Sequence, residues 1–299
     1  SADALLHDLF AQGAQRQNAA SIRGLLGLSL LAVQEGNLTQ VIRYARSLTG
    51  IAEQEQLRLS AGWGRAILAD ALYDRNHLEE SIELNSQVGR DHAYCHFYCV
   101  LESQFALAQA YLASGQPGDA RRTWDHLLAL IDSKNAAEAL AIADAYGAYL
   151  ELLHGDRDAA VHWATHQEPV TVVSSLYAML NPALIKAIIL LGESSRGHLD
   201  SAEANIALVQ TRATQQHFTR PLVRTEALTA ILHLARGERG KADEAFRSSL
   251  ATGLPRGFTR AYLDLGRLFP QYMEDLHSRT PLPAALSSQL KTQIAGALA

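Results

Sequence analysis

The sequence predicts an all-α fold in which helix-turn-helix repeats stack into a solenoid. The first observation is a turn residue that recurs about every forty residues, at Gly36, Asn76, Gly115, Gly155, Gly197 and Gly237. The second is a small residue five positions after each turn: Val41, Ser81, Ala120, Ala160, Ala202 and Ala242. Self-similarity at such a period is typical of arrays in which each helical hairpin packs only on its neighbours. The repeated small residue indicates a close contact between helices.

Apolar residues with a period of 3.6 predict a first helix before each turn and a second helix after it. We expect the first helices at residues 20–34, 58–73, 94–113, 136–153, 182–191 and 220–235. Clear second helices are expected at residues 78–88, 117–131, 199–211 and 239–251. Pro117 and Pro182 fall in first turns, where the missing N–H has no helical partner in any case.

The repeat is least regular between Glu168 and Asn181, where a β-branched and serine-rich run predicts a loop or distorted turn. A two-residue extension within 193–196 lengthens the interval between the turns at Gly155 and Gly197 to 42 residues. Such an extension either changes the curvature of the solenoid or is a harmless insertion in a surface turn. Breakers at Gly253, Pro255 and Gly257 precede two expected closing helices, 258–276 and 282–298. We therefore expect one continuous domain, with a superhelix of about six hairpins over 1–252 and capping helices over 253–299.

Composition excludes several classes of protein. Charged residues are 19% and hydrophobic residues 48%, as in a folded chain, and the net charge of -5 provides no basic face for direct nucleic-acid binding. The longest central apolar stretch, 183–192, is interrupted by Lys186 and is too short to span a membrane. Two cysteines and no visible signal peptide predict a reducing, cytoplasmic location. The start at Ser1 suggests a fragment of a longer protein, although a processed or tagged start looks the same.

A polar stripe follows the first helices. Eleven residues before each turn stand Leu25, Arg65, Gln104, Asp144, Lys186 and Glu226, and seven residues further on, along the same face, stand Ala32, Leu72, Tyr111, Glu151, Glu193 and His233. In tetratricopeptide-like right-handed superhelices the first helices line the concave groove, so we expect a ligand-facing set of Arg65, Gln104, Tyr111, Asp144, Lys186 and Glu226. The alternative is that these are ordinary solvated positions or salt bridges between successive repeats.

Aromatic residues cluster near this stripe. One predicted helix holds Tyr94, Phe97, Tyr98, Phe105 and Tyr111, and the flanking helices hold Trp63, Tyr73, Tyr146 and Tyr149. Such rings can form a platform for a sugar ring or a peptide side chain. The alternative, that most of these rings belong to the core, stays open.

The run His92, Cys95, His96, Cys99 has the spacing of one helical face and carries zinc or copper ligand types. A single straight helix cannot supply four ligands to one tetrahedral ion, and no sequence signal links the run to His162 and His166. Packing cysteines are the alternative, so we assign no metal site.

Catalytic signatures are missing from the chain. Gly240-Lys241 is followed by Ala242 rather than by the Ser or Thr of a phosphate-binding loop, and neither G-x-S-x-G nor H-E-x-x-H occurs. We expect neither an enzyme nor a cofactor.

A more specific resemblance covers about the last fifth of the chain. Its elements are RTEAL at residues 224–228, LARG at 234–237, ADEAF at 242–246 and GFTRAYLDLG at 257–266. This resembles the closing part of the sensor domain in MalT-type regulators, the large ATP-binding LuxR-type transcriptional activators. Tyr262 stands where that family usually has Phe, and Leu265 where it usually has an acidic residue.

The resemblance implies a ligand-sensing and protein-interaction superhelix of a cytoplasmic activator, between an ATPase module and a DNA-binding module that this chain lacks. An effector in the groove would promote self-association of the full-length protein. The alternative function is a tetratricopeptide-like scaffold that binds a peptide or protein segment without a small effector. The effector, the regulated genes and the oligomeric state do not follow from the sequence.

Overall fold

The computed structural model describes residues 19–168, 181–193, 195–265 and 283–290. Of these residues 85% are helical, and none of them lies in a strand. The predicted all-α fold is therefore confirmed. The irregular segment expected between Glu168 and Asn181 and most of the two expected closing helices lie outside the described residues.

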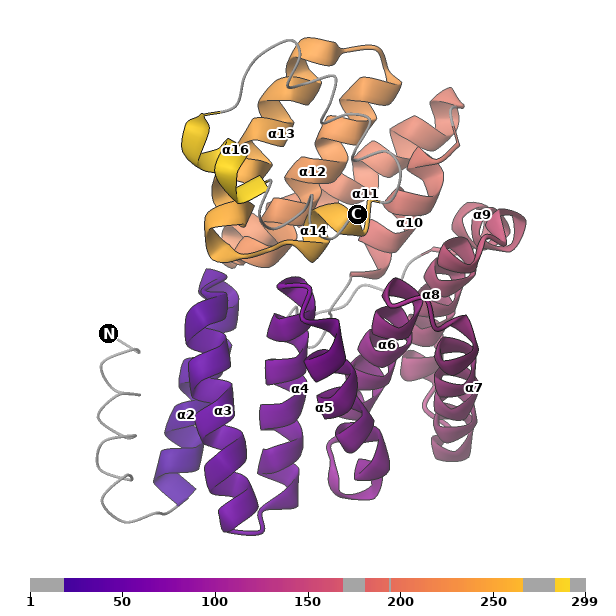
Figure 1. The fold of residues 1–299 in the computed structure, drawn as a ribbon. Helices are drawn as coiled ribbons and strands as arrows, with labels where there is room; N and C mark the ends of the chain where they lie inside the picture. The colour runs from indigo at the N-terminus through magenta and orange to yellow at the C-terminus, as the bar shows by residue number, and fades with distance from the viewer. Residues whose placement is uncertain (1–18, 169–180, 194, 266–282, 291–299) are drawn as a thin grey trace. The chain divides into compact units, whose positions relative to one another are not determined.

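The chain forms two compact units, residues 1–73 with 77–182 and residues 74–76 with 183–299. The first contains α2 (Ala19–Glu35), α3 (Leu38–Gln54), α4 (Arg58–Asp74), α5 (Leu78–Arg90), η1 (His92–Tyr94), α6 (Phe97–Ala113), α7 (Pro117–Lys134), α8 (Ala137–His154) and α9 (Arg157–His166). The second contains α10 (Pro182–Leu191), α11 (Arg196–Gln215), α12 (Thr219–Ala235), α13 (Arg239–Gly253), η2 (Leu254–Arg256), α14 (Arg260–Leu263) and α16 (Ala284–Leu290). Within each unit successive helices pack as antiparallel hairpins (Figure 1).

The compact units divide near residue 182. The break follows α9, a second helix of only ten residues that ends at His166. Most side chains of α9 are exposed, and only Ala160 and Ala164 are buried.

Five of the six predicted turn positions have the left-handed backbone conformation. Gly36, Asn76, Gly115, Gly155 and Gly237 have φ angles between 64° and 99°. Glycine adopts this conformation without steric strain, and asparagine tolerates it better than most residues.

Gly197 is the exception, because it lies in the first turn of α11. The chain turns instead at Gly192 and Glu193, directly after α10. The side chain of Ser195 then caps α11 by accepting from the backbone N–H of His198 at 3.3 Å. The two-residue extension thus displaced the turn from the regular period, and the prediction at Gly197 is wrong.

The turns between repeats contain further left-handed residues that the periodicity did not reveal. Gln56, Asn135 and His217 have φ angles of 56°, 52° and 55°. Each follows a second helix and precedes the first helix of the next hairpin. These positions contain no glycine and lie outside the forty-residue series of turns, so the periodicity did not predict them.

The repeated small residues are buried as predicted. Ala160, Ala202 and Ala242 have no exposed surface, and Ala120 is 3% exposed. Ser81 shows how close the two helices of a hairpin come, because its Oγ donates to the carbonyl of Ala69 across α4 and α5 at 2.9 Å. A larger side chain at these positions would separate the helices.

A buried hydroxyl network joins the end of α13 to α12 and α14. Tyr262 has no exposed surface, and its hydroxyl donates to the carbonyl oxygen of Ser249 at 2.7 Å. The Ser249 Oγ donates in turn to the carbonyl of Val223 at 2.8 Å. A Cβ atom on Gly253 would collide with the Tyr262 hydroxyl and would lie 2.8 Å from the Val223 Cγ1. Glycine at residue 253 therefore leaves room for Tyr262 and Val223 to pack closely there.

We expect Ala202→Leu to destabilise the protein by about 1 to 3 kcal/mol, because the added atoms overpack a buried helix contact. The matched control is Ala204→Leu, on the exposed side of the same helix, which should change the free energy of unfolding by less than about 0.5 kcal/mol. Urea denaturation of both variants measures the difference. Equal stability of the two would show that the repeat register is wrong.

The two glycines of α13 provide a second matched pair. Gly253→Ala should destabilise the chain by about 1 to 3 kcal/mol because of the collision with Tyr262 and Val223. Gly240→Ala, where a Cβ meets nothing within 4 Å, should stabilise it by roughly 0.4 to 1 kcal/mol. Adding Tyr262→Phe to Gly253→Ala should recover part of the loss in thermal unfolding. No recovery would mean that the hydroxyl is not the limiting contact.

Candidate functional site

Arg65 is held between the ends of two second helices. Its Nη2 lies 2.8 Å from the Glu53 Oε1 in α3, and its Nη1 lies 2.8 Å from the Asp91 Oδ2, directly after α5. Burial lowers the pKa of Arg65, but the hydrogen bonds to the two carboxylates outweigh this effect and raise it. The side chain thus stays charged and joins α4 to α3 and to the end of α5.

Gln104 is likewise turned toward a second helix. Its side chain is 6% exposed, and its Nε2 donates to the carbonyl of Asn85 in α5 at 3.1 Å. A Cβ atom on Gly89 would lie 2.8 Å from this amide, so the glycine provides the space that the amide fills. The amide is part of the contact between α5 and α6.

Glu226 in α12 contacts α13. Its Oε1 accepts from the Ser248 Oγ at 3.1 Å, while its Oε2 is buried with no hydrogen-bond partner. Burial raises the pKa of this carboxyl, and the hydrogen bond from Ser248 lowers it by less. A half-buried carboxylate with one unsatisfied oxygen costs free energy of folding at neutral pH.

The other members of the predicted set differ in exposure. Asp144 is exposed, although the nearby protein excludes enough water to raise its pKa. Tyr111 is half-buried, and Lys186 is only 5% exposed within the largely buried helix α10. Leu25, at the same repeat position, has no exposed surface. Asp144 is therefore the most accessible member of the set.

The predicted stripe does occupy one helix face, and at several positions this face is directed at second helices. The companion positions repeat the pattern, because Glu151 pairs with Arg121 of α7 at 3.3 Å, and His233 contacts Glu238 at the start of α13 at 2.7 Å. Salt bridges between successive repeats, the alternative considered for this stripe, therefore occur at Arg65 and Glu151. Whether the six residues bind a ligand stays a prediction.

A different face of the first helices carries aromatic side chains. Trp63 and His96 have ring centroids 5.7 Å apart, and His96 and Tyr98 are stacked with centroids 6.0 Å apart. Trp63 and Tyr98 are half-buried and His96 is exposed. The sequence signal was available, because Trp63 stands two residues before Arg65, which turns it to nearly the opposite side of the helix.

The remaining aromatic residues of the predicted cluster divide between core and surface. Phe105 stacks on Tyr146 with ring centroids 3.7 Å apart, and neither ring has exposed surface. Tyr73 and Tyr149 are also buried, whereas Tyr94 is 54% exposed. The core interpretation thus holds for four of these rings, and the platform interpretation remains for Trp63 and Tyr98.

The expectation that His92, Cys95, His96 and Cys99 share one helical face is wrong. His92 lies in η1, His96 has an extended backbone before α6, and only Cys99 is inside that helix. The helix begins at Phe97 rather than at Tyr94, so the run bends through a turn. Among the described residues, no three His, Cys, Asp or Glu side chains gather closely enough to hold a metal ion.

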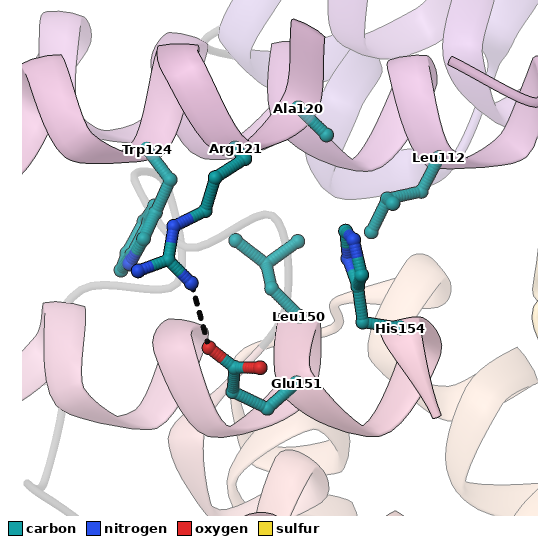
Figure 2. Close-up of a pocket in the computed structure, with 7 residues that line it drawn as sticks. All are labelled: Leu112, Ala120, Arg121, Trp124, Leu150, Glu151 and His154. Carbon is teal, nitrogen blue, oxygen red and sulfur yellow. Dashed lines mark hydrogen bonds and ion pairs between the residues drawn. The ribbon is translucent and has the colours of Figure 1, made fainter. Parts of the chain in front are cut away.

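A hollow between α7 and α8 has an apolar floor and a charged rim. The floor consists of Leu112, Ala120, Trp124 and Leu150. Figure 2 shows Arg121 and Glu151 paired on one side of it and His154 on the other. Its volume of about 20 Å³ admits a water molecule. It is too small for a sugar-sized effector.

The tail motif has structural contacts rather than exposed functional groups. Phe258 and Tyr262 have no exposed surface. Asp264 pairs with Arg260 one turn before it, and its other oxygen lies 4.0 Å from the Arg224 Nη2 in α12. The motif therefore attaches α14 to α12 within the second unit.

Glu226→Gln should stabilise the chain near neutral pH, because it removes a charge that burial disfavours. The raised pKa means that the folded state binds this proton more tightly than the unfolded state, so the wild type loses stability as the pH rises through that pKa. Urea unfolding at about pH 7 and about pH 4, around the carboxyl range, should show a gain only at the higher pH. Glu244→Gln, exposed on α13, should show none at either. A gain that is the same at both pH values would contradict the explanation.

No curated protein matches the chain. Among the described residues, no helix is both long and apolar enough to cross a membrane. The family model described as the MalT-like TPR region matches residues 2–279. Together with the helical repeats, this match shows that the chain belongs to the MalT-like TPR region family.

Proposed function

We propose that the chain is the ligand-sensing and protein-interaction domain of a transcriptional activator. The observation that carries the proposal is the family match over residues 2–279. The helical hairpins support it, because stacked hairpins present a continuous inner surface of first helices for binding. In this proposal the full-length protein contains an ATPase module and a DNA-binding module, and it works in the cytoplasm, where Cys95 and Cys99 stay reduced.

The proposed mechanism is a shift between conformations. An effector that binds one arrangement of the helices more tightly than another shifts the equilibrium toward that arrangement. The free energy of this shift cannot exceed the difference between the effector's binding free energies for the two arrangements. The favoured arrangement then promotes self-association of the full-length protein. The domain itself acts on DNA only through its neighbouring modules, consistent with its net charge of -5.

A scaffold that binds a peptide without a small effector is the second candidate. The aromatic face of α4 and α6 favours it, because open surfaces with half-buried rings suit an extended segment. A small effector needs an enclosing pocket with several convergent polar groups. A thermal-shift screen of sugars, organic acids and amines on this chain separates the two, since a saturating small ligand raises the unfolding temperature by mass action.

The predicted ligand set can be tested best at Asp144, its most exposed charged member. If this stripe binds an effector found in the screen, Asp144→Asn should weaken calorimetric affinity by about 1.5 to 3 kcal/mol, the range for hydrogen bonds to charged groups. Asp132→Asn, which removes an exposed carboxylate from α7, should leave affinity unchanged. Equal affinity of Asp144→Asn and wild type would remove Asp144 from the site. Lys186 is a poorer probe because its substitution also disturbs a buried helix.

A further inference from the structure

The short helix α9 carries two histidines on its exposed side, near its C-terminal end. His162 and His166 are four residues apart, so their side chains are neighbours, one turn apart on one face. Both side chains are exposed, and their rings are stacked with centroids 4.3 Å apart and planes inclined by 30°. The helix thus presents two adjacent imidazoles to solvent.

Hydrogen bonds determine which ring nitrogen of His166 keeps its lone pair. The Nδ1 atom lies 2.8 Å from the carbonyl oxygen of His162 and 2.9 Å from the Thr165 Oγ1. A carbonyl oxygen can only accept, so Nδ1 carries the hydrogen and, in the neutral ring, Nε2 keeps the lone pair. Metal-binding histidines typically donate their other ring N–H to a carbonyl or carboxylate in this way, which orients the ring. His166 therefore has the tautomer of an Nε2 metal ligand.

The spacing and the separation of the two rings suit one ion. Histidines at positions i and i+4 of a helix are two of the zinc ligands in the H-E-x-x-H motif, because both rings reach the same point beside the helix. Imidazoles that share a tetrahedral ion at Zn–N distances of about 2.0–2.1 Å have ring centroids roughly 5 Å apart. The separation of 4.3 Å in α9 is close to this value, and exposed side chains can open by the difference.

The sequence of the pair differs from that catalytic motif at one informative position. It reads His-Trp-Ala-Thr-His, so Trp163 stands where the motif has the glutamate that acts as general base. The pair therefore has the ligands of the motif without its base, which favours binding of an ion over hydrolysis.

Water must complete the coordination of an ion held by this pair. Among the described residues, no third His, Cys, Asp or Glu side chain gathers with the two histidines. The other ionisable side chains of α9 are Arg157 and Asp158. Asp158 is exposed one turn before His162 on the same side, where its carboxylate attracts a cation. Arg157 lies about 140° from His162 around the helix.

We propose that His162 and His166 bind a divalent transition-metal ion of the class that imidazole favours, namely Zn²⁺, Ni²⁺ or Cu²⁺. Because both ligands must stand on one turn, the bound ion stabilises the helical conformation of residues 162–166. This stabilisation matters for α9, since the helix has only ten residues, of which Ala160 and Ala164 are the buried ones. Such an ion site is independent of the proposed effector.

The test titrates this chain, freed of metal, with Zn²⁺ in a calorimeter. At about pH 7.5, roughly one unit above the ordinary pKa of histidine, both rings are mostly neutral and able to bind. The wild type should bind Zn²⁺ saturably, whereas Mg²⁺, which prefers oxygen ligands, should not bind at this site. His162→Ala and His166→Ala should each weaken Zn²⁺ binding at least about tenfold, since even the loss of a group that orients a ligand costs roughly 10- to 100-fold in metal affinity.

Two controls separate the pair from single histidines. His77→Ala removes an exposed histidine that has no other histidine within four residues, and should change the affinity less than about twofold, as for an independent site. His166→Ala combined with Gln167→His keeps the number of histidines but moves the second ring off the shared face. This double variant should bind Zn²⁺ as weakly as His166→Ala. Thermal unfolding confirms that each variant is folded.

Amide hydrogen exchange measures the effect of the ion on α9. Zn²⁺ should slow exchange over residues 162–167 of the wild type, because the bound ion opposes local opening of the last turn. It should have no such effect in His166→Ala.

Several results would overturn the proposal: no saturable Zn²⁺ binding, an affinity of His162→Ala equal to that of the wild type, equal effects of His77→Ala and His166→Ala, or exchange that Zn²⁺ leaves unchanged. None of them touches the effector proposal, because that proposal is tested with sugars, organic acids and amines rather than with metal ions.

Discussion

The close approach of the two helices in each hairpin is the constraint on which the rest of the structure depends. At Ala160, Ala202 and Ala242 no solvent reaches the side chain, and at Ser81 the side chain bonds directly to the backbone of the facing helix. Helices at this separation need small residues at the crossing and short turns to join them. Left-handed residues such as Gly115 and Gly155 supply those turns with little strain. The small residues and the turns recur about every forty residues because each hairpin repeats this geometry.

The same packing determines what the polar side chains of the first helices do. A first helix contacts second helices on one side, so polar residues on that side form salt bridges or hydrogen bonds with the second helices. Arg65 binds carboxylates at the ends of α3 and α5, and Gln104 binds the backbone of α5. The face two residues earlier, with Trp63 and Glu102, has half-buried rings and a carboxylate.

The segment 249–264 shows how a resemblance in sequence corresponds to packing. Tyr262 fills the space beside Gly253 and bonds to Ser249, while Asp264 pairs with Arg260 and approaches Arg224. These contacts attach the tail to α12 and α13 within the second unit. A hydroxyl at residue 262, where the family usually has Phe, is accommodated because a backbone carbonyl accepts from it. A motif of this kind identifies the family by its role in stability, without marking a ligand site.

The sequence by itself determined the fold class, the repeat period, five of six turn positions and the buried small residues, because each follows from local periodicity or from glycine's backbone freedom. It missed the displaced turn at Gly197 and the left-handed Gln56, Asn135 and His217, which lie outside the forty-residue series of turns. Only the tertiary structure decided which face of α6 meets α5, that the His92 to Cys99 run bends, and that the chain divides near residue 182. Helical periodicity shows that residues share a face, but the direction of that face depends on neighbouring helices that are distant in sequence.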